Sequence, residues 1–137
     1  MINVQVNGGA TPNPGMRAIG VVISKNGTVV KQISKNMGIG TNNEAEYLAL
    51  IEGLKLANDL GFIDTDIVIQ SDSQLVVSQV NEWWEVTKDN LKPLNAEARE
   101  LLSKFQSARV EWIPKRRISK ATATKVLGHM EPPASCA

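Results

Sequence analysis

Three residues have side-chain oxygen atoms that could bind a cation: Asn7, Glu46 and Asp72. Each is expected at the end of a strand or the start of a helix, where α/β domains usually bind their ligands. Asn7 follows an alternating stretch at 2–6 that is typical of a strand. Asp72 follows a short apolar stretch at 66–71, of the kind buried in the centre of a sheet. Glu46 stands in the first turn of a helix expected between them. Ligands of open α/β sheets bind beyond the carboxyl ends of strands, so we expect the three side chains to converge.

The stretch Thr41–Tyr47 around Glu46 is typical of a helix start. Thr41 and Asn42 are good N-cap residues, and apolar residues follow them at helical spacing. Free N–H groups at such a start bind phosphate or sugar oxygens, and a carboxylate there binds a cation. The alternative is an ordinary capping arrangement with a solvated glutamate. The expected convergence with the two strand-end residues favours the functional interpretation.

The composition indicates one globular domain without disulfides. The chain has 137 residues, 42% of them hydrophobic, and a formal net charge of +1. Its single cysteine, Cys136, has no partner for an internal bridge, which favours a reducing, cytoplasmic setting. No apolar run approaches the roughly 18 residues of a membrane-spanning helix, so no membrane association is expected. Basic residues crowd near the C-terminus: Lys115, Arg116, Arg117, Lys120 and Lys125.

The order of the predicted elements indicates a mixed α/β sheet with helices on its faces. Three antiparallel strands are expected first, at 2–6, 18–24 and about 28–36, with residues 7–10 in a turn and a hairpin at 25–27. Later elements are a helix at 42–59 closed by Gly61, a strand at 66–71, a short helix from Asp72-Ser73, a helix at 94–106 and a strand at 109–113.

Four motifs in this order resemble a type 1 ribonuclease H, in the prokaryotic form that lacks a basic insertion. They are Asn7-Gly8-Gly9-Ala10 with Asn13-Pro14-Gly15, then Thr41-Asn42-Asn43-Glu44-Ala45-Glu46, then Ser71-Asp72-Ser73-Gln74, then Val110-Glu111-Trp112-Ile113-Pro114-Lys115. The resemblance implies a ribonuclease H-like fold with a five-stranded mixed sheet, three strands antiparallel and two parallel, flanked by helices. It covers a domain core at 1–114 and leaves an atypical tail at 115–137.

The resemblance implies an endonuclease that hydrolyses the RNA strand of RNA/DNA hybrids with two Mg²⁺ ions, or Mn²⁺ in their place. Glu46 and Asp72 match the second and third family carboxylates. The first is normally an aspartate, and Asn7 stands at its position without the charge. We therefore expect Asn7, Glu46 and Asp72 to form the catalytic metal site, and the chain to be weakly active or inactive. The alternative is a non-catalytic module that binds hybrids.

The hybrid itself is expected to contact residues of three motifs and the linker after the second helix. The candidates implied by the resemblance are Gly9, Asn13, Thr41, Asn42, Asn43, Trp83 and Lys88. Asn42 and Asn43 match positions that sense 2′-hydroxyls, and Thr41 matches one that binds a DNA phosphate. Capping roles and a solvated lysine are the alternatives. Of Trp83 and Trp84, one is expected in the core and one exposed, and the protein is expected to be a monomer.

The tail departs from the family pattern. An asparagine and, four residues later, an aspartate are usual there, whereas Ile118 and Thr122 stand at these positions. A reading frame shifted by one base near residue 117 makes asparagine and aspartate accessible at these positions, so a frameshift is one hypothesis for the tail. Sequencing of the gene tests it. His129 does not match the surroundings of the family's mobile histidine and is interpreted as incidental.

Overall fold

Five strands form one mixed sheet in the order β3-β2-β1-β4-β5. The structure is a computed structural model that describes residues 1–115, so Ile118, Thr122, His129 and the basic tail beyond Lys115 lie outside the described residues. The strands are β1 (Ile2–Thr11), β2 (Gly15–Lys25), β3 (Thr28–Gly40), β4 (Asp66–Ser71) and β5 (Ser107–Trp112). Strands β1, β2 and β3 pair antiparallel, whereas β4 pairs parallel with β1 and with β5. The predicted mixed sheet is confirmed.

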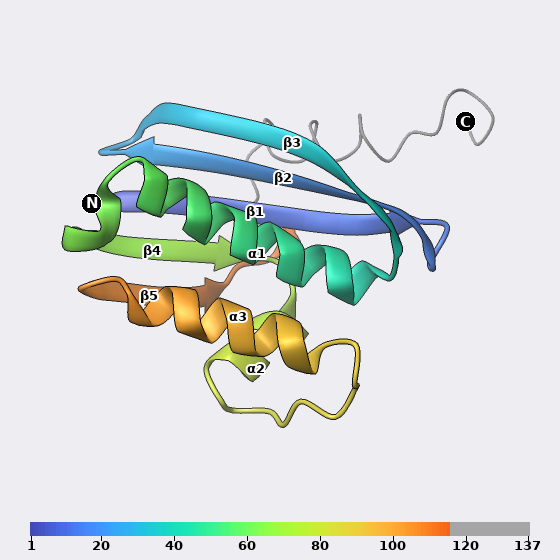
Figure 1. The fold of residues 1–137 in the computed structure, drawn as a ribbon. Helices are drawn as coiled ribbons and strands as arrows, with labels where there is room; N and C mark the ends of the chain where they lie inside the picture. The colour runs from blue at the N-terminus through green and yellow to red at the C-terminus, as the bar shows by residue number, and fades with distance from the viewer. Residues whose placement is uncertain (116–137) are drawn as a thin grey trace.

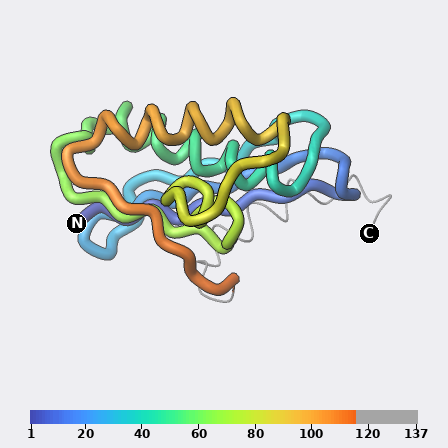
Figure 2. The backbone as a smooth tube through the Cα atoms, turned by 90° about the horizontal axis from the view of Figure 1, so that it is seen from below, coloured from blue at the N-terminus to red at the C-terminus, as the bar shows by residue number. Residues whose placement is uncertain are grey.

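Two helices cover one face of this sheet. The helical elements are α1 (Asn42–Asp59), the short 3₁₀ helix η1 (Phe62–Asp64), α2 (Gln74–Val80) and α3 (Lys92–Ser103). Helices α1 and α3 lie side by side over the strands, and the view along the sheet shows them as a separate layer (Figures 1 and 2). Strand β4 ends beside Val6 of β1, and β1 continues beneath the start of α1 toward the far end of the molecule (Figure 1). Within the described residues, no helix is both long and apolar enough to cross a membrane.

Local sequence signals set the limits of α1 as predicted. Thr41 is the N-cap: its hydroxyl accepts from the N–H of Glu44, whose carboxylate accepts from the N–H of Thr41. Beyond the other end, Gly61 has φ 84°, a left-handed conformation that glycine adopts without strain. The helix start that carries Glu46 is therefore fixed by a reciprocal pair of hydrogen bonds.

The first strand is longer than predicted. Residues 7–10 were expected in a turn after a strand at 2–6, but β1 continues to Thr11 and pairs with β2 over its whole length. Their glycines do not mark a turn here: Gly8 lets the strand pass directly under α1, where a side chain would collide with the carbonyl oxygen of Ala45. Asn7 consequently lies inside a paired strand and not in a loop.

Three further predictions need correction. The third helix spans Lys92–Ser103 rather than 94–106, because Pro93 fits within a first helical turn. The last strand spans Ser107–Trp112 rather than 109–113, in register with β4. Neither Trp83 nor Trp84 belongs to the core, since they are 69% and 49% exposed. Glu82 directly before them has φ 65°, which turns the chain away from the domain interior.

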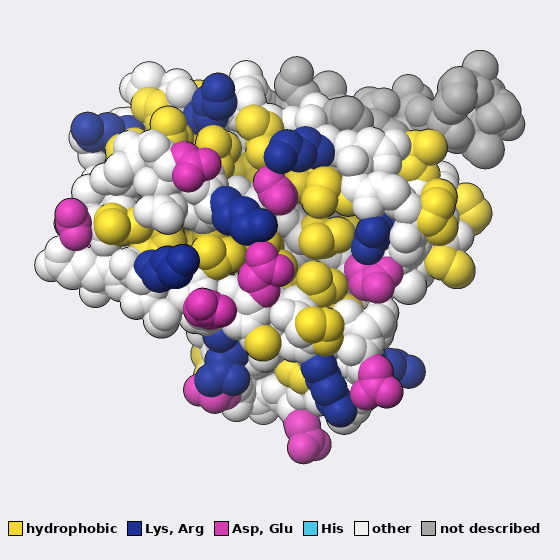
Figure 3. All heavy atoms as spheres, viewed as in Figure 1, with side chains coloured by type: hydrophobic (Ala, Val, Ile, Leu, Met, Phe, Trp, Pro, Cys, Tyr) yellow, Lys and Arg dark blue, Asp and Glu magenta, His cyan; other side chains and the backbone are white. Residues whose placement is uncertain are grey.

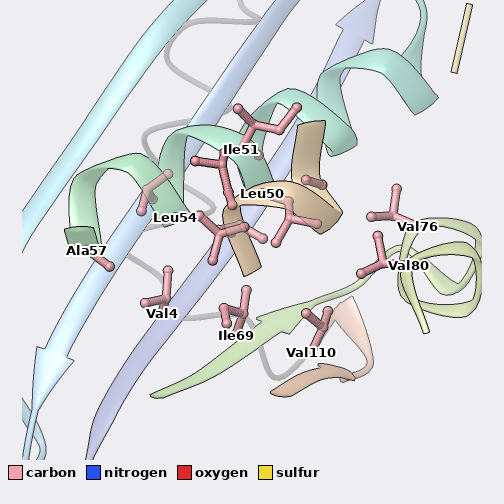
Figure 4. Packing of buried hydrophobic residues seen from close by; sticks show 14 of the residues in the cluster. Val4, Leu50, Ile51, Leu54, Ala57, Ile69, Val76, Val80 and Val110 are labelled. Atoms are coloured by element: carbon pink, nitrogen blue, oxygen red, sulfur yellow. The ribbon is translucent and has the colours of Figure 1, made fainter. Parts of the chain in front are cut away.

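The hydrophobic core lies between α1 and the strands beneath it. Leu50 and Leu54 point from α1 toward Val4 and Ile69 on the two central strands (Figure 4). Gly53 brings the helix close to β1, because a Cβ there would lie 2.9 Å from a methyl group of Val6. This close packing fixes the height of α1 above the sheet, and therefore the position of its first turn.

We expect Gly8→Ala to destabilise the protein by about 1–3 kcal/mol, because the added methyl group must push α1 away from β1. Urea unfolding followed by circular dichroism measures the effect. Ala18→Gly is a useful comparison, since it changes one methyl group on the neighbouring strand without adding volume. Stability of Gly8→Ala equal to that of the parent would contradict the close approach.

Candidate active site

The carboxyl groups of Glu46 and Asp72 are in hydrogen-bond contact. Glu46 reaches the pair from just beyond the first turn of α1, and its Oε1 also accepts from the N–H of Gly8 at 2.8 Å. Asp72 follows β4 directly. A proton or a cation between two neighbouring carboxyl groups relieves their mutual repulsion.

Asn7 lies beside this pair. The last registered pair of β1 and β4 joins Val6 to Ser71, so Asn7 and Asp72 are the next residues along two neighbouring parallel strands. Adjacent strands lie about 4.8 Å apart. Asn7 is 6% exposed. The structure thus brings together the three residues expected to form the metal site.

The surroundings of Glu46 disfavour its ionised form. Burial raises its pKa well above the usual value, and the neighbouring charge of Asp72 and their hydrogen bond raise it further. The N–H of Gly8 acts in the opposite direction. A divalent cation would take the place of the proton that these conditions favour, since oxygen ligands of this kind suit a hard cation.

Asp72 is held by its backbone, which leaves its side chain available. The indole N–H of Trp112 donates to the Asp72 carbonyl at 3.2 Å, and Ser73 caps α2. Among the described residues, Asp72 Oδ1 is buried without a hydrogen-bond partner. A buried oxygen in this state indicates a ligand, since it is costly to leave unsatisfied. The donor set therefore fits a divalent cation.

The site nevertheless has one charge fewer than a three-carboxylate centre. Within residues 1–115, no group of three Asp, Glu, His or Cys side chains lies close enough to hold a metal ion. Asn7 supplies one amide oxygen at the third position. Such a site attracts cations more weakly, because each lost negative charge removes a Coulomb attraction in a partly desolvated setting.

A groove of about 520 Å³ lies beside the N-terminus of α1. It contains five of the seven residues expected to bind nucleic acid: Asn13, Thr41, Asn42, Asn43 and Lys88. Pro14, Asn90 and Leu91 complete its lining. Segments far apart in the sequence therefore meet in a single polar groove.

Asn42 organises this groove. Its backbone N–H donates to Asn13 Oδ1 at 3.0 Å, and its own Oδ1 accepts from the N–H of Ala10 at 2.6 Å. Both amide oxygens are the acceptors in these bonds, so the NH₂ groups of Asn13 and Asn42 are the donors of the two side chains. These donors suit ligands rich in acceptors, such as sugars and phosphates.

The other two candidates lie outside the groove lining. Gly9 is buried in β1 between Gly8, which contacts Glu46, and Ala10, which contacts Asn42. It therefore lies between the carboxyl pair and the groove. Trp83 is exposed just after α2, where its backbone N–H donates to the carbonyl of Ser78.

Sequence reasoning missed Asn90 and a buried network of polar side chains. Asn90 lines the groove, and its side chain bonds to Glu44 of the capping box. The hydroxyl of Tyr47 is hydrogen-bonded to both Gln79 and Asn95 inside the protein. Asn90 could have been noticed from its place two residues after Lys88, whereas the pattern of α2 and α3 gave no sign that their amides are buried.

The face covered by α1 and α3 carries interspersed charges of both signs (Figure 3). Ion pairs across this face include Lys35 with Glu52 and Lys55 with Glu97. Paired surface charges of this kind produce little net field. The helix face thus offers no one-signed patch for a polyanion, in contrast to the groove with Lys88.

Comparison with known proteins gives a consistent family relationship. Residues 5–125 match the family described as "Reverse transcriptase-like". The chain is 36% identical over 123 residues to "Ribonuclease HI" of Halobacterium salinarum, covering 89% of this chain and 61% of that protein. It is also 36% identical to "Bifunctional protein Rv2228c" of Mycobacterium tuberculosis, over 83% of this chain and 31% of the relative. The chain thus spans less than two thirds of the length of these relatives.

Solved structures with this fold are matched over most of their own length. The crystal structure of RNase H1 from Halobacterium salinarum superposes with a TM-score of 0.85 at 35% identity, covering 93% of this chain and 97% of that chain. LC11-RNase H1, solved in complex with an RNA/DNA hybrid, superposes with a TM-score of 0.83 at 30% identity, covering 88% and 91%.

We expect Glu46→Gln to stabilise the metal-free protein at neutral pH by on the order of 1 kcal/mol. A folded-state pKa that is raised gives stability that is complete at pH below the unfolded value and is lost as the pH rises through the folded value. The substitution removes this loss. Thermal unfolding in EDTA across pH 4–8, about 4 units, measures it.

Glu44→Gln is the matched control, two positions away on the same helix. The pKa of Glu44 is lowered in the folded protein, chiefly by the N–H of Thr41. Its ionised carboxylate therefore stabilises the fold at pH above the pKa of the unfolded state, and this stabilisation is lost as the pH falls through the folded-state pKa. The two substitutions should therefore change the pH profile in opposite senses. A change of the pH profile in the same sense in both variants would contradict a raised pKa of Glu46.

Proposed function

The chain belongs to the type 1 ribonuclease H family, and from this membership we propose that it is an endonuclease for the RNA strand of RNA/DNA hybrids. The observation that carries the proposal is the position of the Glu46 and Asp72 pair directly beside the polar groove at the start of α1. A strand bound in that groove presents its backbone to the two carboxylates. We further propose that Asn7 impairs the reaction in this chain.

Glu46, Asp72 and Asn7 would hold the divalent metal ions on which enzymes of this family depend, and Mg²⁺ is proposed here, with Mn²⁺ as a substitute. Bound metal ions supply activation of the attacking water and stabilisation of the leaving oxygen. The protein's part is positional. Gly8 orients Glu46 through its N–H, and Trp112 holds the backbone of Asp72.

The groove supplies recognition of the hybrid. Asn42 and Asn43 are proposed to contact 2′-hydroxyls, by which a protein distinguishes RNA from DNA. Thr41 and Lys88 are proposed to contact phosphates, which adds affinity without sequence preference. Support comes from their shared groove and from LC11-RNase H1, a similar structure solved with an RNA/DNA hybrid.

A non-catalytic hybrid-binding module is the second candidate. The specific observation in its favour is that the groove is complete, whereas Asn7 removes one charge from the metal site. Hydrogen bonds to sugars and phosphates do not need the carboxylates. This candidate predicts hybrid binding that survives Glu46→Gln and Asp72→Asn.

We expect Asn7→Asp to raise cleavage of the RNA strand in Mg²⁺ by at least about 100-fold, the order that one transition-state electrostatic contact contributes. Cleavage of a labelled hybrid, resolved on a denaturing gel, measures the rate. Adding Asp72→Asn to the Asn7→Asp variant should abolish the gain. Comparable turnover by the parent chain and Asn7→Asp would refute the impairment by Asn7, and an absence of cleavage in the repaired chain would favour the binding module.

Lys88→Ala should weaken hybrid binding and reduce the dependence of log K on log salt concentration by about 0.7–0.9, the value for one lost phosphate contact. Fluorescence anisotropy with a labelled hybrid at several salt concentrations gives this slope. Lys104→Ala is the control, because Lys104 is an exposed lysine at the far end of α3. Equal slopes for the two variants would exclude a phosphate contact at Lys88.

A further inference from the structure

A buried network of polar side chains links three helices beneath the groove. The hydroxyl of Tyr47 donates to Gln79 Oε1 at 2.7 Å and accepts from Asn95 Nδ2 at 3.1 Å. These side chains come from α1, α2 and α3 and are 0%, 5% and 7% exposed. Buried polar groups are costly unless paired, so this network is satisfied in one relative arrangement of the helices.

The network also holds the segment that connects α2 to α3. Residues 81–91 contain no helix or strand. Gln79 Nε2 donates to the carbonyl of Glu85 at 3.3 Å in the middle of this segment. At its end, Leu91 is buried and donates its N–H to the carbonyl of Lys88. One amide side chain, Gln79, therefore joins the helix that carries Glu46 to the middle of this segment.

The same segment contributes to the groove. Lys88, Asn90 and Leu91 form one side of it, and the first turn of α1 forms the other. Tyr47 follows Glu46 directly, in the next turn of α1. A second cavity of about 370 Å³, lined partly by Gln79, Glu85 and Asn95, gives the segment room to move when its bonds are lost.

We propose that the Tyr47–Gln79–Asn95 network is a positioning device that holds residues 81–91 against α1 and so sets where Lys88 meets the backbone of a bound hybrid. The proposal rests on the proposed function for the ligand and on the hydrogen bonds for the mechanism. Tyr47 and Gln79 act through Lys88 and are positioning residues, because neither reaches the groove lining.

The decisive variant is Tyr47→Phe, which removes only the shared hydroxyl group. We expect amide hydrogen exchange in residues 81–91 to become at least about ten-fold faster, while exchange within β1 and β2 is unchanged. Ile23→Val is the control: it loses one buried methyl group of β2 without touching the network. Gln79→Met, which keeps the side-chain length, should reproduce the effect of Tyr47→Phe.

Binding of a labelled RNA/DNA hybrid in EDTA, measured by anisotropy at several salt concentrations, is the second readout. Tyr47→Phe should bind about ten-fold more weakly and with a salt slope lowered by about 0.7–0.9, as for Lys88→Ala. Combining Tyr47→Phe with Lys88→Ala should cost little more than either alone, because both remove the same contact. Ile23→Val should keep the slope of the parent chain.

Unchanged exchange in residues 81–91 of both network variants would overturn the proposal. So would fully additive losses in Tyr47→Phe combined with Lys88→Ala, since the two residues would then act independently. A parent chain that does not bind the hybrid at all would refute the proposed function instead, and the exchange measurement would still decide whether the network positions the segment.

Discussion

The contact between the carboxyl groups of Glu46 and Asp72 is the constraint on which the rest of the structure depends. Electrostatics disfavours this contact until a proton or a cation lies between the two groups, so the fold must impose it. The register of β1 with β4 fixes Asp72, and the capped start of α1 fixes Glu46. Close packing of α1 on β1 at Gly8 then brings the two together. Hydrophobic burial thus supplies the free energy that holds an electrostatically unfavourable pair.

The acidic side chains and the polar groove lie in different parts of the site. The carboxyl pair lies at the strand ends, whereas the groove is built from amides, a hydroxyl and one lysine around the N-terminus of α1. Asn7 changes the first part and leaves the second intact. A chain with this arrangement can lose much of its chemistry while it keeps its affinity, because phosphate and sugar contacts do not pass through the metal ligands.

Elements with strong local signals could be predicted from the sequence. The cap at Thr41 and the left-handed Gly61 set the limits of α1, and Asn26-Gly27 with positive φ made the expected hairpin. The extension of β1 through Gly8 could not be predicted, because pairing with β2 imposes it against the local preference of glycine. The burial of Asn95 and the exposure of Trp83 likewise depend on tertiary contacts, which cannot be inferred from composition or local pattern. The groove was predictable only through the family resemblance.

The hydrogen bond from Gly8 to Glu46 joins residues 38 positions apart, and Asp72 joins the pair from further along the chain. Contacts of such long range form late, after loop closure has been compensated by packing. During synthesis on the ribosome, the carboxyl pair cannot assemble until Asp72 has emerged, and the complete groove cannot assemble until Leu91 has emerged. The fraction of molecules in which Glu46 and Asp72 have met is therefore a measure of the fraction in which β1, α1 and β4 have packed together.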